Sequence, residues 1–288
     1  MDCGDIDYVP GDLEQTFGEA VAQAYRDLLK PDTSLKTDWK HFNDVLGGLQ
    51  RGCLYIIAAR PGDGKTDFAL HLAVQLAKRC RVDYRSLEMT KEQLVHRVLS
   101  RVCMINSTRF RDHDLNENAQ KRIGIAAARM GDLHLVMDDT PGVSAGDVEA
   151  KLASGKPDVM FIDYLGLMRG DAAGNKPLWQ ITGEITHALK ESARRHGAAV
   201  VALVQLARAA DRQKEPALSD LKGGSDIEAD ADGVIFMRPQ KTGEFLSGDD
   251  AWPVEAVIAK NRHGGVGRLR FNWQPQYHNY VPTDNTRR

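Results

Sequence analysis

The sequence contains no long hydrophobic run and few cysteines. Its longest uncharged apolar run, residues 198–204, is far shorter than the roughly 20 residues that a membrane-spanning helix requires. The opening segment MDCGDIDYVPGD has neither the basic nor the apolar region of a signal peptide. The four cysteines, Cys3, Cys53, Cys80 and Cys103, form no CxxC pair and have no histidine spacing suited to zinc. These absences predict an intracellular, cytoplasmic protein with no membrane attachment, no disulfide and no cysteine-bound metal.

An excess of one charge sign is also missing. There are 38 Lys and Arg residues against 40 Asp and Glu residues, which gives a net charge of −2. This balance excludes a protein coated in positive charge but permits a local basic groove. Apolar residues make up 42% of the chain and charged residues 27%, which excludes global disorder. A chain of 288 residues corresponds to one large domain, or to one domain with an appendage.

An amphipathic helix is predicted over residues 12–30, because apolar residues recur there at helical spacing and Pro31 stops the pattern. The recurring residues are Leu13, Phe17, Val21, Ala24 and Leu28. We expect an N-terminal segment, 1–35, that carries this helix, followed by a main domain, 36–288. The apolar stripe must be buried, either on its own domain or on a neighbouring subunit, and the sequence favours neither.

The main domain alternates between strand-like and helix-like segments. The strand-like runs are 53–59, 82–87, 133–137, 159–165, 198–206, 233–237, 254–260 and 268–273, with helical patterns at 65–80, 91–103, 115–131, 144–154 and 178–196. Several strands are apolar on both faces, as in a parallel sheet covered by helices. Three glycines between the last two strands predict a hairpin. The fold class is therefore α/β, with a mostly parallel twisted sheet flanked by helices.

The segment 54–66, LYIIAARPGDGKT, fits the P-loop pattern with Ala59 in place of the first glycine. The predicted nucleotide-binding residues are Ala59, Arg60, Pro61, Gly62, Asp63, Gly64, Lys65 and Thr66. Small residues let the backbone N–H groups of such a loop point at phosphate oxygens, and the following helix adds its dipole. Lys65 would reach the β- and γ-phosphates and Thr66 would ligate Mg²⁺. Asp163, at the end of an apolar run, would hold that ion through water.

These motifs, with others, resemble the ATPase domain of the DnaB-type replicative helicases, a branch of the RecA-like family, from about Leu35 to Tyr280. The segments that carry the resemblance are GGLQ (47–50), AARPGDGKT (58–66), SLEM (86–89), IDYL (162–165), Gln205, DLKGGSDIEAD (220–230) and KNRHGGVG (260–267). The resemblance implies a RecA-like core, ATP and Mg²⁺ as cofactors, and a ring-forming, hexameric homo-oligomer.

The resemblance also implies catalytic roles. Glu88 matches the glutamate that orients the water attacking the γ-phosphate, and Gln205 matches a γ-phosphate sensor. Lys260 and Arg262 match a pair that reaches into the neighbouring subunit's nucleotide site, where Arg262 would be the arginine finger. Read without the family, Glu88 fits the first turn of a helix and Arg262 a solvated surface charge.

A path for single-stranded DNA is predicted in residues 205–232, which contain basic residues but no aromatic side chain. Base stacking is therefore unavailable there, and contact with the DNA backbone is the workable mode. The candidate contacts are Arg208, Lys222, Gly223, Gly224 and Ser225, of which residues 222–225 resemble the family's DNA-binding loop. The alternative for these residues is a surface loop.

Some features depart from the family. Family members usually carry an N-terminal helical domain that contacts primase, whereas only about 35 residues precede this core. Asp63 places a negative charge inside the phosphate cradle, where it would weaken nucleotide binding unless its side chain points outward. A competing motif, GVSAG at 142–146, fits the nucleophile elbow of α/β-hydrolases, but Ser144 lies too far beyond the preceding strand and is better read as a helix N-cap.

The sequence thus predicts an ATP- and Mg²⁺-dependent DNA helicase that assembles as a ring, hydrolyses ATP between subunits and moves along single-stranded DNA. A helicase loader or primase is the expected protein partner. The alternative is a RecA-like ATPase that is not a motor but serves as a DNA-binding, remodelling or loading module in replication or recombination.

Overall fold

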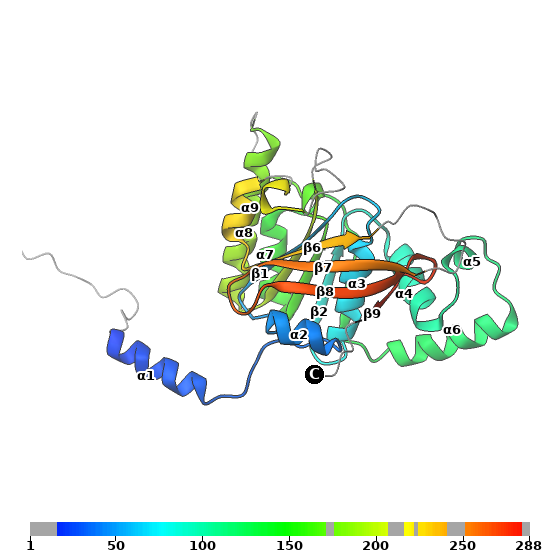
Figure 1. The fold of residues 1–288 in the computed structure, drawn as a ribbon, viewed down its shortest axis with the longest axis horizontal. Coiled ribbons are helices and arrows are strands. Elements are labelled where there is room, and N and C mark those ends of the chain that lie inside the picture. The colour runs from blue at the N-terminus through cyan, green and yellow to red at the C-terminus, as the bar shows by residue number, and fades with distance from the viewer. Residues whose placement is uncertain (1–15, 171–175, 207–215, 222–223, 241–250, 284–288) are drawn as a thin grey trace, which may run out of the picture. The chain divides into compact units, whose positions relative to one another are not determined.

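The computed structural model describes residues 16–170, 176–206, 216–221, 224–240 and 251–283 (Figure 1). Residues 1–33 and 34–288 form two compact units. In the first unit, α1 spans Phe17–Leu28, and the predicted start of that helix, residues 12–15, lies outside the described residues. Most apolar residues of α1 are exposed, including Phe17 at 85% and Leu28 at 83%.

The larger unit is built on one nine-stranded sheet in the order β3-β2-β4-β5-β1-β6-β7-β8-β9. The strands are β1 (Leu54–Ala59), β2 (Val82–Ser86), β3 (Leu135–Asp138), β4 (Val159–Asp163), β5 (Ala199–Gln205), β6 (Gly233–Pro239), β7 (Trp252–Asn261), β8 (Gly267–Gln274) and β9 (Asn279–Pro282). The first six are parallel to one another, and β7, β8 and β9 continue the sheet in antiparallel fashion. The predicted α/β class, parallel core and final hairpin are therefore confirmed.

Helices cover both faces of this sheet, and two further helices, α5 and α6, pack on α4 beside it. The helices of this unit are α2 (Lys40–Leu46), α3 (Lys65–Leu76), α4 (Lys91–Cys103), α5 (Ser107–Arg111), α6 (Glu117–Met130), α7 (Ala145–Gly155), α8 (Leu178–His196) and α9 (Gly224–Asp230), with 3-10 turns at Leu165–Leu167, Leu218–Asp220 and Pro275–Tyr277. The sequence patterns missed α2, α5, α9 and β9, all of them seven residues or shorter. Such short elements present too few turns or alternations for a periodic signal.

Alternate side chains of β1 enter two different cores. Tyr55 and Ile57 pack with α2 and α3 on one face, and Leu54 and Ile56 pack with α7 and α8 on the other. Every residue of β1 is buried, because successive side chains of a strand point to opposite faces and helices cover both of them. A third, smaller core lies between α4, α5 and α6. The central strand is thus held rigidly, with its carboxyl end at the start of the P-loop.

The polar residues of β2 are paired within the sheet. Asp83 accepts a hydrogen bond from Arg85 at 2.8 Å, and Arg85 also reaches Asp138 on β3 at 2.5 Å. The two residues that make this strand more polar than its neighbours therefore stabilise each other and its pairing with β3.

Candidate active site

The P-loop follows β1 and leads directly into α3, which begins at Lys65. Gly62 and Gly64 have φ values of +79° and +82°, a left-handed conformation that side chains disfavour. At Gly64 a Cβ would also come within 2.3 Å of the hydroxyl of Tyr280. Glycine is therefore required at this position both by the backbone and by the close approach of β9.

Lys65 lies between two carboxylates. Its Nζ is 3.3 Å from Oε2 of Glu88 and 3.5 Å from Oδ1 of Asp163, and it lies 4.8 Å from the centre of the Tyr164 ring. The Lys65 side chain is 9% exposed and that of Asp163 is 2% exposed, so this ion pair is largely withdrawn from water. In the sequence, Lys65 is 23 positions from Glu88 and 98 positions from Asp163. The fold thus brings together three residues that the sequence analysis assigned to one site.

Asp163 is oriented by a buried tyrosine. The hydroxyl of Tyr84 donates to Oδ2 of Asp163 at 2.9 Å, and the Tyr84 ring stacks on Phe161. Burial, together with the adjacent Asp163, raises the pKa of Tyr84 well above its ordinary value, so the hydroxyl stays protonated and keeps donating. Because Oδ2 is engaged, Oδ1 is turned towards Lys65. Asp163 and Thr66, at the first turn of α3, are oxygen donors of the kind that hold Mg²⁺.

Glu88 lies in the connection between β2 and α4, with a side chain that is 47% exposed. The connection is tied down because Leu87 donates to the carbonyl of Asp163 at 2.7 Å and the Ser86 hydroxyl donates to the carbonyl of Met89 at 2.6 Å. Helix α4 begins only after Thr90, which forms a capping box with Gln93. Glu88 is therefore a loop residue at a strand end and not part of a helical first turn.

Gln205 is the last residue of β5 and lies opposite Ala59, the last residue of β1, in the parallel register. The next residue, Leu206, donates to the carbonyl of Ala59 at 3.0 Å. Gln205 is half-buried and stands at the same edge of the sheet as the P-loop.

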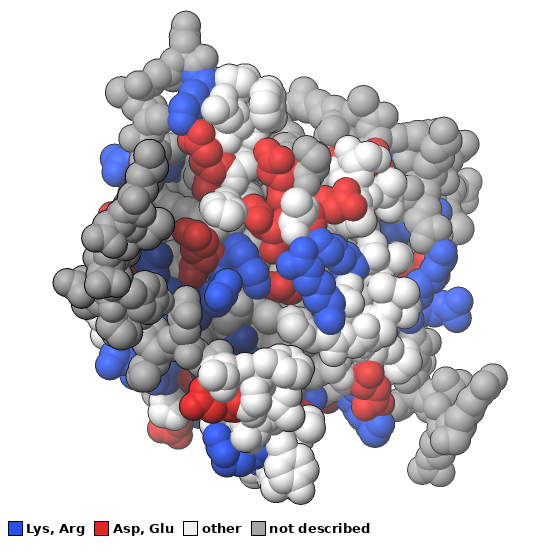
Figure 2. Space-filling model, turned by 90° about the vertical axis from the view of Figure 1, so that its left-hand side faces the viewer, with Lys and Arg blue, Asp and Glu red and all other residues white. Residues whose placement is uncertain are grey.

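Lys260 and Arg262 lie at the opposite edge. The register pairs Tyr55 at the start of β1 with Gly233, and Gly233 with Asn261 at the end of β7. The turn after β7 is therefore next to the beginning of β1, and the P-loop is at its end. Figure 2 looks at the molecule from the side where α8 and α9 lie in Figure 1, and it shows acidic and basic side chains gathered next to one another on that face. A six-residue strand spans roughly 20 Å, so Arg262 lies far from Lys65, Glu88 and Asp163 of its own chain.

The first turn of α3 is clamped by residues that the sequence patterns did not identify. Asp67, which is 3% exposed, accepts from Arg97 at 2.8 Å and lies 3.0 Å from Nδ1 of His278. Burial alone would raise the pKa of Asp67, but the hydrogen bonds and charges of His278 and Arg97 outweigh burial and hold the pKa below its usual range. These residues are 30 and 211 positions apart, so no spacing in the sequence could have indicated their contact.

Asp63 is buried, at 5% exposed, so its side chain does not point into solvent. The hydroxyl of Tyr280 donates to the carbonyls of Asp63 and Gly64 at 3.4 and 3.2 Å. The C-terminal strand β9 thus supports the loop from behind.

The predicted DNA contacts are only partly described. Arg208, Lys222 and Gly223 lie outside the described residues, and Gly224 and Ser225 are the first two residues of α9. Ser144 is confirmed as the N-cap of α7, where it forms a capping box with Asp147. It lies six positions beyond the end of β3, which excludes a nucleophile elbow.

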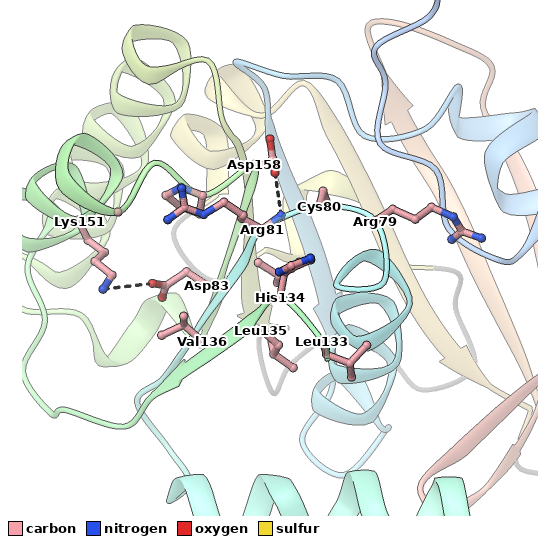
Figure 3. A pocket seen from close by; sticks show the side chains of 13 residues that line it. Arg79, Cys80, Arg81, Asp83, Leu133, His134, Leu135, Val136, Lys151 and Asp158 are labelled. Atoms are coloured by element: carbon pink, nitrogen blue, oxygen red, sulfur yellow. Dashed lines mark hydrogen bonds and ion pairs between the residues drawn. The ribbon is translucent and has the colours of Figure 1, made fainter. Parts of the chain in front are cut away.

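A large pocket lies away from this site, where β2 and β4 begin (Figure 3). Its volume is about 510 Å³, and it is lined by Arg81, His134, Lys151 and other residues. Lys151 is 3.7 Å from Asp83, and Asp158 accepts from the backbone of Arg81 at 2.7 Å. The pocket is at the amino ends of the parallel strands, whereas Lys65, Glu88 and Asp163 are at their carboxyl ends.

Within the described part of the chain, no helix has the length and apolar character needed to cross a membrane.

Comparison with known proteins gives one family. A family model described as the DnaB-like helicase C terminal domain matches residues 34–282. The replicative DNA helicase DnaC of Bacillus subtilis is 33% identical over 257 residues, which cover 86% of this chain and 56% of that protein. The replicative DNA helicase DnaB of Geobacillus stearothermophilus is 32% identical over 259 residues, with coverage of 86% and 56%. The chain spans a little more than half the length of these curated relatives.

Two solved structures support the same family assignment. A structure described as an ATPase domain superimposes with a TM-score of 0.83 at 27% identity, covering 92% of this chain and 98% of that one. A DnaB-like replicative helicase, described together with its interactions with primase, gives a TM-score of 0.82 at 27% identity and covers 92% of this chain and 68% of its own.

Proposed function

Because this chain belongs to the family of DnaB-like helicase C-terminal domains, we propose that it is an ATP-hydrolysing motor that assembles as a ring and moves along single-stranded DNA. The observation that carries the proposal is the separation of charges across the sheet. Lys65, Glu88 and Asp163 converge at one edge, and Arg262 lies at the other edge. Two copies placed head to tail would bring these halves together.

ATP would bind with its phosphates in the P-loop and draw Lys65 away from the two carboxylates. Glu88 would then be released to orient a water molecule and accept its proton. Thr66 and Asp163 would hold Mg²⁺, which neutralises phosphate charge when bound. Arg262 of the next subunit, with Lys260, would stabilise the charge that develops on the γ-phosphate. Gln205 would sense that phosphate, since it ends the strand beside β1.

Assembly would involve α1. Its apolar stripe is 51% to 85% exposed and consists of Phe17, Val21, Tyr25 and Leu28. A stripe of this kind needs a partner surface. We propose that α1 docks on a neighbouring copy and that the assembly is a hexamer. Single-stranded DNA would contact residues 222–225 and Arg208 along the channel. Primase or a helicase loader is the proposed protein partner, since one solved relative interacts with primase.

Two measurements test the proposal. The ATPase rate per subunit should rise steeply with protein concentration, because each site needs a neighbour, and an equal rate in dilute monomers would contradict the trans arrangement. The protein should also displace a strand from a forked duplex in the presence of ATP. ATP hydrolysis that single-stranded DNA stimulates, without any strand displacement, would favour the non-motor module instead.

A further inference from the structure

The side chain of Arg262 is held by its own chain beside the end of α9. Its backbone N–H donates to the carbonyl of Asp232 at 2.8 Å, and Nη2 donates to the carbonyl of Ala229, also at 2.8 Å. Nη1 lies 3.4 Å from Oδ1 of Asp232. The Arg262 side chain is 48% exposed, so the guanidinium is bound on one side and open to solvent on the other.

Lys260 is held by the same helix end, where its Nζ donates to the carbonyl of Glu228. Glu228 and Ala229 belong to the last turn of α9. Carbonyls in a last turn lack partners within the helix and carry the negative end of its dipole. The two cations that are proposed to act in trans therefore share one group of acceptors in cis.

Asp232 is a fixed acceptor. Its side chain is 3% exposed, and Oδ2 accepts from the backbone of Leu54 at 2.7 Å and from Lys190 at 2.5 Å. Burial alone would raise the pKa of Asp232, but these two hydrogen bonds and the charges of Lys190 and Arg262 hold it below its usual range. Oδ1 is the oxygen that faces Arg262.

A metal ion is a poor alternative partner for this carboxylate. Cys53, Asp232 and His263 have ligand atoms within 4.8 Å of one another. However, Lys190 and Arg262 both oppose a divalent cation beside Asp232. Burial and the charge of Asp232 also raise the pKa of Cys53 to about 11, which disfavours the thiolate that a metal requires.

We propose that Asp232 and the last carbonyls of α9 form a holding site that competes for Arg262 with the charge that develops on the γ-phosphate in the neighbouring subunit's site. The inference rests on the proposed function. A guanidinium that spends part of its time held in cis acts in trans only for the remaining fraction, which lowers the turnover of the neighbouring site in proportion. Asp232 touches neither nucleotide nor water in this scheme and is a positioning residue.

Mixed assemblies test the inference. Donor subunits carry Lys65→Ala and cannot turn over ATP, and acceptor subunits carry Arg262→Ala and lack the finger. In the mixture, turnover arises only where a donor's Arg262 meets an acceptor's site. Adding Asp232→Asn to the donor should raise the kcat of the mixture about two- to fivefold, which is the range for an ion pair in which one partner, here Arg262, is exposed. The KM for ATP should not change. The amide oxygen of asparagine can still accept from Leu54 or Lys190.

A second donor variant, Lys190→Gln, is the control. It removes the competing cation from Asp232, which should strengthen the hold on Arg262 and lower the restored turnover about twofold. Opposite effects of the two donor variants support the holding site, whereas equal effects, or no change with either, overturn it. If Asp232→Asn fails to fold, Lys190→Gln alone decides, since an unchanged or higher rate contradicts the inference. Absence of any turnover in the original mixture would instead contradict the proposed function.

Discussion

The two edges of the parallel sheet are built in opposite ways. At the carboxyl edge, Lys65 is 9% exposed and is enclosed by carboxylates from two other strands' ends. At the amino edge, the Arg262 side chain is 48% exposed, and its guanidinium is held by one backbone carbonyl, that of Ala229, and by one carboxylate, that of Asp232. The first arrangement is a prepared site in which the charges are already oriented. The second leaves a cation that a stronger anion can remove.

This difference gives a reason why one chain alone would hydrolyse ATP slowly. In the proposed reaction, the carboxyl edge of one copy contributes the cation Lys65, and the amino edge of the neighbouring copy contributes the cation Arg262. Catalysis then requires contact between copies, which ties hydrolysis to assembly. The variants below alter one edge while leaving the other intact, and the control variants alter neither.

The largest effect is expected for Arg262→Ala. Turnover in the assembled protein should fall about a thousandfold, the lower end of the range for arginine fingers. Nucleotide affinity of the isolated subunit should not change, because Arg262 is remote from its own P-loop. Titration with a fluorescent ATP analogue and steady-state ATPase assays measure the two quantities. Arg268→Ala is the matched control, since Arg268 is similarly exposed, at 49%, and should retain full activity.

Glu88→Gln should lower kcat about a hundredfold, at the lower end of what a positioned general base contributes. The amide keeps the shape of the side chain but cannot accept a proton, so ATP should bind at least as tightly as in the unaltered protein. Rapid-quench turnover and equilibrium binding separate the two effects. A variant that loses affinity and turnover equally would show that Glu88 serves Lys65 and not the water.

Much of the carboxyl edge could be predicted from the sequence. The P-loop is contiguous, Asp163 ends an apolar run, and parallel strands bring their carboxyl ends to one edge. The roles of Glu88, Gln205 and Arg262 needed the family resemblance, because a lone polar residue after a strand has many uses. The contacts of Asp67 with His278 and of Tyr280 with the P-loop could not be predicted, since the partners are far apart in the sequence and meet because β8 and β9 extend the sheet.

Asp67→Asn should loosen the clamp on the first turn of α3 and raise the KM for ATP about tenfold, which corresponds to one charged hydrogen bond. The pKa of Asp67 is lowered in the folded state, so its stabilising effect is full above the unfolded carboxyl range, about pH 4, and is lost as the pH falls through the folded value. Urea denaturation from pH 7 to pH 3 should therefore show the unaltered protein and the variant converging in acid.

Asp112→Asn is the control for that comparison. Asp112 also has a lowered pKa, caused by its hydrogen bond with Arg111, but both side chains are more than half exposed. Exposed pairs contribute little, so this variant should neither change the KM nor alter the acid profile. If it matched Asp67→Asn, general charge loss and not the clamp would be responsible.

The smallest effect is expected for Tyr280→Phe, which tests how strongly β9 supports the P-loop. The lost hydroxyl donates over 3.2 and 3.4 Å, and the carbonyl of Gly64 also accepts from Phe68 at 3.0 Å, so that acceptor keeps a partner. The cost in stability should be about 1 kcal/mol. The ring would still stack on Trp273. The KM for ATP should rise no more than about twofold, because about 0.4 kcal/mol is roughly a factor of two.

Tyr280→Ala removes the ring as well and should cost about 3–5 kcal/mol. Thermal denaturation with and without nucleotide distinguishes the two, and equal losses would mean that the hydroxyl, and not the packing, carries the support.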